Sequence, residues 1–370
     1  MTADYDVAIL GAGLAGLSLA VRLAELPAPP RILLVDRRTD YARDRTWCHW
    51  ATAPHPFTAS VSHRWHEWDL RCGPRIIQRG HPAFAYERIP ADLFYAEALA
   101  RLAATGTVER RLGVEVLKVV PDGEGATVTL AGGPSLRVRQ VYDSRPRSAP
   151  PGRWRQIFRG LELRGKRNDS TRVTLMDFRS AGPAGARFFY VLPLSPDTLL
   201  VEDTWITRSG EDPVFDDAEI LNYARERFGE GEWTCLHREE GVIPMRVEDR
   251  PSAPRSVIFI GTAGGAVRPS SGYAFTRIQR QSAALAEAYA QGCAQASQPR
   301  LPDWFDHVFL RAIDREPERM PEFMLALFER VPAERLLRFM ESHATLLDLW
   351  AIVSSLPAWP FIRACATLRR

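Results

Sequence analysis

Several features that define special classes of protein are missing from this sequence. The five cysteines are scattered, odd in number and without a CxxC pair, which argues against a disulfide framework or a zinc site. No run approaches the roughly 20 apolar residues that a membrane-spanning helix needs, and the longest apolar stretch, 346–361, contains Pro357 and Pro360. The first residues do not resemble a signal peptide. We therefore expect a cytoplasmic protein that does not span a membrane.

The sequence also lacks an excess of either charge. Its 370 residues include 48 Lys and Arg against 45 Asp and Glu, for a net charge of +3, so we expect no nucleic-acid-binding surface. Lysine occurs only as Lys118 and Lys166, and arginine carries nearly all of the positive charge. The length and a hydrophobic content of 45% suffice for two packed domains with a sizeable core.

A dinucleotide-binding pattern opens the chain. The apolar run 6–10 is typical of a strand buried on both faces, and it leads directly into the glycine motif Gly11-Ala12-Gly13-Leu14-Ala15-Gly16. Apolar residues over 17–24 follow helical spacing, and 31–36 indicates a second strand. A GxGxxG motif between a strand and a helix predicts a Rossmann unit, although a glycine-rich turn without a ligand is the alternative.

Each glycine of such a motif has a mechanical task. Gly11 makes the tight turn, Gly13 lets the backbone approach a pyrophosphate, and Gly16 lets the helix pack closely on the strand. Asp36 ends the second strand, where a carboxylate accepts hydrogen bonds from a ribose hydroxyl and disfavours NADP. An ion pair with one of the two following arginines is the alternative for Asp36. The pattern predicts binding of FAD or NAD.

A second joint of strand, glycines and helix lies far along the chain. The apolar segment 256–260 leads into Gly261-Thr262-Ala263-Gly264-Gly265, and a helical pattern follows over 274–291. An alternating strand pattern over 136–143 ends in Asp143 and a polar turn. Gly261, Gly264 and Gly265 are suited to the other end of a dinucleotide, although a simple tight turn is the alternative. Two such joints in one chain favour a flavin.

Short motifs over nearly the whole chain resemble those of the bacterial lycopene β-cyclases. In order, they are Thr46-Trp47, Asp143-Ser144-Arg145, and the segments 156–160, 175–178, 190–194, 201–204, 241–245 and 269–273. The sequence departs from the family at Cys48-His49-Trp50, and Thr262 stands where many FAD enzymes place an acid.

The resemblance implies an α/β fold of the glutathione-reductase and aromatic-hydroxylase type. We expect a Rossmann-type FAD-binding domain, an inserted mixed β-sheet substrate domain and a C-terminal helical region. The FAD-binding domain is predicted over 1–50, 81–150 and 251–300, the substrate domain over 51–80 and 151–250, and the helical lid or membrane-facing region over 301–370.

The resemblance also implies a reaction, which is cyclisation of the acyclic ends of lycopene to β-rings. This isomerisation is initiated by a proton, involves no net redox change and uses reduced FAD, with NAD(P)H as the external reductant. The family places its critical acid at Glu202, and burial near a polyene would raise the pKa of that carboxyl. A strand over 198–201 would direct Glu202 and Asp203 to opposite faces. Asp177 is a further candidate acid.

The remaining site predictions concern binding. We assign Arg45 and Asp143 to the cofactor, and Trp47 and Tyr273 to the substrate. The alternative for Glu202 and Asp203 is ion pairing with arginines at a domain seam, and for Asp177 it is a buried, hydrogen-bonded structural carboxylate. We predict no metal site, because His49, His63 and His66 lack ligand spacing on a shared helix.

The substrate implied by the resemblance dissolves in membranes. The apolar C-terminal segment 325–353 and the arginines beyond it suit a membrane surface, although packing of these helices over the substrate sheet is an equal alternative. We therefore expect a peripheral membrane protein. An FAD-dependent monooxygenase or isoprenoid reductase of the same fold is the alternative enzyme, and a carotenoid or flavin carrier is the non-enzymatic one.

Overall fold

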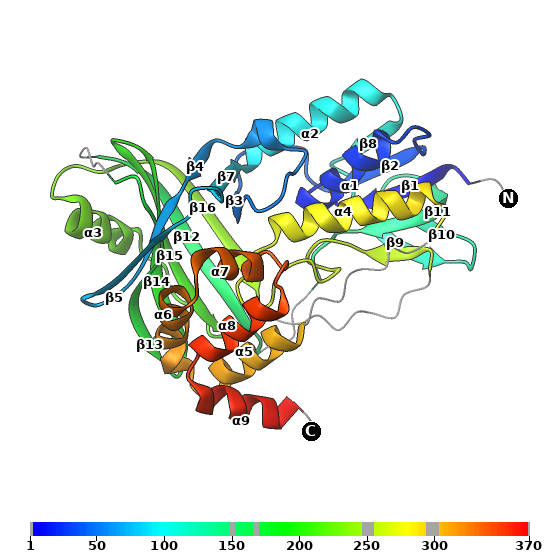
Figure 1. The fold of residues 1–370 in the computed structure, drawn as a ribbon. Helices are drawn as coiled ribbons and strands as arrows, with labels where there is room; N and C mark the ends of the chain where they lie inside the picture. The colour runs from blue at the N-terminus through cyan, green and yellow to red at the C-terminus, as the bar shows by residue number, and fades with distance from the viewer. Residues whose placement is uncertain (1–2, 148–151, 166–169, 246–254, 294–302, 369–370) are drawn as a thin grey trace.

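A computed structural model describes residues 3–147, 152–165, 170–245, 255–293 and 303–368 of the chain. The described residues form three sheets with helices packed on them (Figure 1). The first sheet lies at the N-terminal end of the molecule, and the largest sheet lies at the opposite end, with the C-terminal helices beside it.

The first sheet is built around the opening strand. Its seven strands are β1 (Tyr5–Leu10), β2 (Ile32–Asp36), β8 (Val108–Leu112), β9 (Val116–Pro121), β10 (Ala126–Leu130), β11 (Ser135–Asp143) and β17 (Val257–Phe259). β1 pairs in parallel with β2 and β11, and β17 pairs in parallel with β11. β1 therefore lies in the interior of the sheet, which explains its nearly all-apolar sequence.

Three helices cover one face of this sheet: α1 (Leu14–Ala24), α2 (Ala91–Thr105) and α4 (Phe275–Ala290). α1 contacts both α2 and α4, and the apolar residues of all three share one core with β1 and β2. The strands predicted at 6–10 and 256–260 and the helix predicted at 274–291 are confirmed as β1, β17 and α4.

The largest sheet by number of residues also has seven strands, which are longer and mostly antiparallel. Its order is β16 (Thr234–Pro244), β12 (Trp154–Arg164), β15 (Thr198–Arg208), β14 (Gly185–Ser195), β13 (Val173–Gly182), β5 (Glu67–Cys72) and β6 (Arg75–Gly80), with β13 and β5 parallel. The prediction that a strand ends at Val201 is wrong, because β15 continues to Arg208 through both carboxylates. Charged residues are rare within buried strands, and the sequence alone did not reveal what neutralises these two.

A small sheet joins the two larger ones. It consists of β3 (Thr46–Trp50), β7 (Tyr86–Pro90) and β4 (His63–Trp65), with β7 in the centre. The segment 51–80 is therefore divided, because β4 belongs to this small sheet while β5 and β6 belong to the largest one. A short helical turn, η1 (Thr58–Ser60), precedes β4.

Helices cover both faces of the largest sheet. α3 (Asp217–Phe228) packs on one face. The C-terminal elements pack on the other face, and they are α5 (Asp303–Arg315), η2 (Pro317–Arg319), α6 (Met320–Arg330), α7 (Ala333–Met340), α8 (Leu346–Ser355) and α9 (Ala358–Leu368). The predicted α/β fold with a mixed sheet and a C-terminal helical region is confirmed.

Among the described residues, no helix taken alone has the length and apolar character to cross a membrane. By length and composition, α8 and α9 pass such a test only as a pair, and the pair is bent by 112°.

Candidate active site

An apolar cavity of about 370 Å³ lies beside the largest sheet. Its walls come from that sheet, from β3 and β7 of the small sheet, from the loop before α4, and from the C-terminal helices. Its lining includes Phe158 and Phe188 of the sheet and Leu327 and Phe328 of α6. Most of the lining side chains are apolar, so the cavity suits a hydrophobic ligand.

Four of the predicted site residues line this cavity: Arg45, Trp47, Glu202 and Tyr273. Thr262, from the glycine-rich joint after β17, lines it as well. The structure therefore brings the predicted substrate residues, one predicted acid and the second cofactor joint to the same cavity.

Glu202 lies in the middle of β15, and a glycine leaves room beside its side chain. Gly160 on β12 pairs with Glu202 on one side and with Glu239 of β16 on the other. A Cβ atom at Gly160 would lie 2.9 Å from Cγ of Glu202 and 3.1 Å from Cγ of Glu239. Because position 160 has no side chain, the two carboxyl groups can approach each other above it.

The electrostatics of this pair favour a neutral Glu202. Its accessible surface borders the apolar cavity, and burial raises the pKa of its carboxyl well above 4.5. Repulsion by Glu239 and a hydrogen bond with it raise this pKa further, while Arg88 opposes the shift. Arg88 itself lies 3.6 Å from the Glu162 carboxylate. Burial and the second carboxyl therefore both favour the protonated form of Glu202.

Hydroxyl and thiol groups stand beside Glu202. The Tyr190 hydroxyl donates to Tyr86 at 3.1 Å, and the hydroxyls of Tyr86 and Tyr273 lie 3.3 Å apart. Burial raises the pKa of the Cys48 thiol to about 12, so this cysteine is not a thiolate nucleophile. These groups provide polar contacts at one end of the cavity without adding charge.

The other two predicted acids lie on the opposite face of the sheet. Asp203 accepts hydrogen bonds from Arg187 at 2.9 and 3.0 Å. Asp177 accepts one from Tyr223 of α3 at 2.9 Å and lies 3.6 Å from Arg227. Neither lines the cavity. The alternative of ion pairing with an arginine describes Asp203, and the alternative of a hydrogen-bonded structural carboxylate describes Asp177, so we leave both out of the chemistry.

The glycine motif has the geometry of a phosphate cradle. Gly11 has a φ of +92°, and a Cβ atom at Gly16 would lie 1.9 Å from the carbonyl oxygen of Gly11. At Gly13 the nearest atom to an added Cβ would be an Arg38 nitrogen at 3.9 Å, so protein packing does not require a glycine there. The α1 N-terminus has no side-chain cap. These observations fit a pyrophosphate at Gly13, held by free N–H groups.

Asp36 lies beside this cradle. Its carboxylate accepts hydrogen bonds from the backbone N–H groups of Ala12 at 2.7 Å and Arg38 at 2.9 Å, and the Arg38 guanidinium lies 3.3 Å away. The alternative of an ion pair is therefore present in the structure. The contact of Asp36 with a ribose stays a prediction.

Most of the other predicted cofactor residues lie at or just after the ends of β11 and β17, which are neighbours in the first sheet. Asp143 pairs with Leu10 at the end of β1, and its carboxylate binds Arg145 at 2.8 and 3.0 Å. Gly261 and Gly265 have positive φ, and an added Cβ at Gly264 would lie 2.3 Å from the Phe259 carbonyl oxygen. These glycines are therefore required by the turn itself. The Arg45 side chain is half-exposed and pairs with Asp44.

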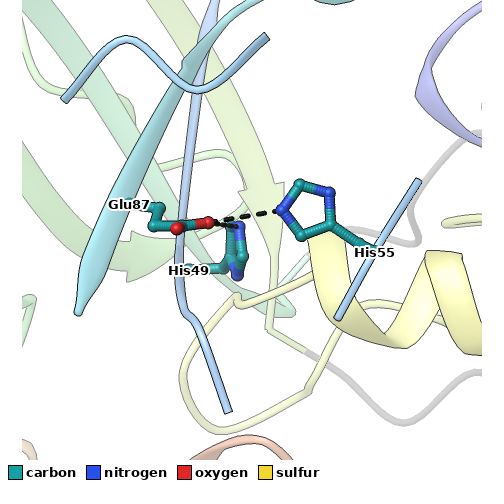
Figure 2. A group of neighbouring side chains, drawn as sticks. All are labelled: His49, His55 and Glu87. Carbon is teal, nitrogen blue, oxygen red and sulfur yellow. Dashed lines mark hydrogen bonds and ion pairs between the residues drawn. The ribbon is translucent and has the colours of Figure 1, made fainter. Parts of the chain in front are cut away.

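The structure also assembles a cluster that the sequence analysis missed. Nε2 of His49 and Nε2 of His55 each lie 3.3 Å from Oε2 of Glu87, and Figure 2 shows the three side chains pointing toward one another. Two imidazoles and a carboxylate are a ligand set that zinc accepts.

The contacts around this cluster favour hydrogen bonding to Glu87 over metal binding. The Phe57 N–H donates to Nδ1 of His55 at 3.2 Å, so a neutral His55 carries its proton on Nε2, where a metal would need the lone pair. Arg64 donates to the other Glu87 oxygen at 2.7 Å. Burial would raise the pKa of Glu87, but contacts from His49, His55 and Arg64 outweigh it and lower that pKa well below its usual range.

Sequence reasoning missed Gly160, Glu239 and Arg88 as neighbours of Glu202. A signal was available, because Gly160 ends the motif 156–160 and Glu239 lies two residues before the motif 241–245. The strand order, however, was not readable from the sequence, and it is what places β12 and β16 beside β15, while Arg88 comes from β7 of the small sheet.

Several solved structures share this fold. A flavin-dependent brominase has a TM-score of 0.62 at 14% identity, with 99% of each chain covered. A geranylgeranyl bacteriochlorophyll reductase-like protein from Thermoplasma acidophilum has a TM-score of 0.59 at 14% identity, covering 98% of this chain and 96% of that one. A halogenase solved with FAD has a TM-score of 0.56 at 11% identity, covering 90% and 78%. The fold is therefore that of an FAD-binding α/β protein.

The sequence comparisons are more specific. The family model described as lycopene cyclase protein matches residues 6–366. The lycopene beta-cyclase of Pantoea ananas is 26% identical over 392 residues, covering 98% of each chain. That of Pseudescherichia vulneris is 27% identical over 391 residues, covering 96% of this chain and 95% of the other. The chain belongs to the lycopene cyclase family.

Proposed function

We propose that the protein cyclises the acyclic ends of lycopene to β-rings, without net redox change and with reduced FAD as its cofactor. The observation that carries this proposal is the position of Glu202, whose carboxyl lines an apolar cavity beside Glu239 and has a pKa raised by burial. A hydrocarbon has no polar group for an enzyme to bind, so the reaction must start with a proton donor that is protonated and shielded from water. The similarity to lycopene beta-cyclases agrees with this site.

The reaction begins and ends at a carboxyl group. The Glu202 O–H bond breaks and its proton forms a C–H bond at the terminal double bond of the polyene. The resulting tertiary cation is attacked by a neighbouring double bond, which closes the ring. A ring C–H bond then gives its proton back to a carboxylate and its electrons to the new double bond. Atoms and electrons balance within the substrate, so the product has the same mass.

The cavity wall protects the cation. Phe158, Phe188 and Trp47 present aromatic surface, and a desolvated aromatic face stabilises a cation by up to about 2 kcal/mol. The apolar helices α6 and α8 keep water from adding to the cation. The hydroxyls of Tyr190, Tyr86 and Tyr273 at the Glu202 end are hydrogen-bonded to one another, which restrains them from acting as nucleophiles.

The residues present fit FAD. Gly11, Gly13 and Gly16 with the α1 N-terminus would hold the pyrophosphate, and Asp36 the ribose. Asp143, Arg45, Gly261, Gly264 and Gly265 form the proposed remainder of the site. When bound in reduced form, the flavin supplies negative charge near the cavity, and NAD(P)H is the proposed source of its electrons. A Gly16→Ala variant should lose bound flavin by absorbance, whereas Gly133→Ala, in open space, should retain it.

We also propose that the protein takes lycopene from a membrane surface. Exposed apolar side chains of α8 and α9 include Leu346 at 85%, Trp350 at 69% and Trp359 at 66%, and the same helices line the cavity through Ile352 and Phe361. A variant with Trp350→Ser and Trp359→Ser should sediment less with anionic vesicles than the wild type does. Unchanged sedimentation would remove this surface from the proposal.

The direct test is the mass of the product formed in a lycopene-accumulating bacterium. Cyclisation leaves the mass unchanged and shortens the conjugated system, so red lycopene becomes a yellow product. An added oxygen would instead indicate the monooxygenase alternative, and added hydrogens would indicate the reductase alternative. Unchanged lycopene with abundant, flavin-loaded protein would refute the proposed substrate.

A further inference from the structure

Two carboxyl groups, Glu202 and Glu239, share the space above Gly160. The register places Glu202, Gly160 and Glu239 in one row across β15, β12 and β16. Their side chains are on the cavity face, because alternate residues of a strand face the same side and Asp203 and Glu240 bind arginines on the other. Two carboxylates in one buried space repel each other unless they share a proton.

The hydrogen bonds of Glu239 leave one oxygen for such a proton. Thr46 donates to Oε2 of Glu239 at 2.9 Å. Oε1 of Glu239 is buried and receives no hydrogen bond from the N–H and O–H groups of residues in the described ranges. A buried carboxylate oxygen without a donor is costly. The Cγ atoms of Glu202 and Glu239 lie on the same side of Gly160, so a protonated Glu202 would supply the missing donor.

The charges around the pair do not replace this proton. The groups that face it are Tyr190 of β14, Cys48 of β3, Tyr86 and Arg88 of β7, Tyr273 before α4, and Glu162 of β12. Arg88 is the cation among them, and it lies 3.6 Å from Glu162, which also pairs with Arg43 at 3.0 Å. Tyrosine and cysteine are neutral here because burial raises the pKa of each.

We propose that Glu239 is a positioning residue that accepts a hydrogen bond from the protonated Glu202. This hydrogen bond keeps Glu202 protonated and its carboxyl oriented until it protonates the substrate. This inference rests on the proposed function and deepens it. When Glu202 gives its proton to the polyene, the pair is left with two negative charges. The proton released from the ring then returns to the pair, which restores the starting state with no oxidant or reductant.

The first test is the pH dependence of cyclisation. Removing the Glu239 charge with Glu239→Gln should let Glu202 ionise more easily, so activity should be lost at a pH lower by about one unit or more. Glu239→Asp, which keeps the charge, should retain more of the wild-type profile. Glu240→Gln is the matched control, because Glu240 is exposed and binds Arg159 on the other face. An unchanged profile in Glu239→Gln would overturn the inference.

A second measurement needs no lycopene. Infrared titration should show a protonated carboxyl C=O band at neutral pH in the wild type. The Glu202→Gln variant should lack this band, and the Glu239→Gln variant should lose it at lower pH. A wild type without the band, or a Glu239→Gln variant with an unchanged titration, would overturn the inference. A protein that shows the band but does not cyclise lycopene would refute only the proposed substrate.

Gly160→Ala tests the same contact from a third strand. The added methyl group would meet the Cγ atoms of both glutamates, so it should separate the carboxyls and move the band to lower pH without removing either group. A titration that matches the wild type would show that the open space at Gly160 is not needed.

Discussion

Two neighbouring rows of residues cross the largest sheet on opposite faces, and they neutralise their carboxylates in different ways. The row under α3 contains Asp177, Phe189, Asp203, Arg159 and Glu240, in which each carboxylate has an arginine partner. The row on the cavity face contains Tyr190, Glu202, Gly160 and Glu239. Within the described part of the chain, Glu202 has no ion-pair partner.

The comparison separates a structural carboxylate from a chemical one. Asp203 binds Arg187 on the face away from the cavity, so that carboxyl is not placed to give a proton to a ligand there. On the cavity face the nearest arginine, Arg88, is shared with Glu162, and a second carboxyl raises the pKa of Glu202. Glu202 and Asp203 are adjacent on β15, yet only Glu202 is suited to donate a proton, because the two faces of the sheet present different partners.

The largest expected effect is the loss of the proton donor. Glu202→Gln should lower the cyclisation rate of purified protein by about 10²-fold or more, because the amide cannot serve as the acid. Its free energy of unfolding should stay within about 1 kcal/mol of wild type, since no ion pair is lost. Product chromatography and urea denaturation measure these two quantities. Wild-type turnover by the variant would remove Glu202 from the mechanism.

The pH dependence of cyclisation and of stability should test the role of Glu202 in a second way. Cyclisation should decline as pH rises through the raised pKa of Glu202, because only its protonated form donates. Above the usual pKa of 4.5, the folded protein keeps a proton that the unfolded chain has lost, so this group's contribution to stability decreases with rising pH. Denaturation across pH should show this slope in wild type and a smaller one in Glu202→Gln; equal slopes would contradict the assignment.

The opposite face should respond with stability instead of activity. Asp203→Asn leaves the Arg187 guanidinium without its main partner, so the free energy of unfolding should fall by about 1–3 kcal/mol. Arg187 also lies near Glu219, which limits the loss. The cyclisation rate of the folded variant should change by less than about threefold, well below the effect expected for the acid. A large rate loss without a loss of stability would place Asp203 in the chemistry.

The smallest effect is expected at Asp177. Asp177→Asn keeps an acceptor for the Tyr223 hydroxyl and weakens an ion pair whose atoms are 3.6 Å apart, so the loss of stability should be about 1 kcal/mol or less. Thermal unfolding at matched pH and a rate measurement test this expectation. A loss equal to that of Asp203→Asn would show that the two ion pairs are equivalent.

Much of the fold was predictable because its signals are local. The apolar run of β1, the glycine motif and the helical spacing of α4 each reflect contacts within a short segment. The limits of β15 were not predictable in the same way. The strand continues through Glu202 and Asp203 because β14, β12 and β16 provide the arginine and the second carboxyl that make these residues tolerable there.

The amino-acid sequence by itself determined the phosphate cradle, the alternation that separates Glu202 from Asp203, and the family to which the chain is similar. Only the tertiary structure decided which carboxylate is paired with an arginine, and it brought Glu239 beside Glu202 and His55 beside Glu87. The reason is physical: backbone geometry and side-chain alternation are set by near neighbours, whereas the charge state of a buried group depends on partners that only strand order and packing bring together.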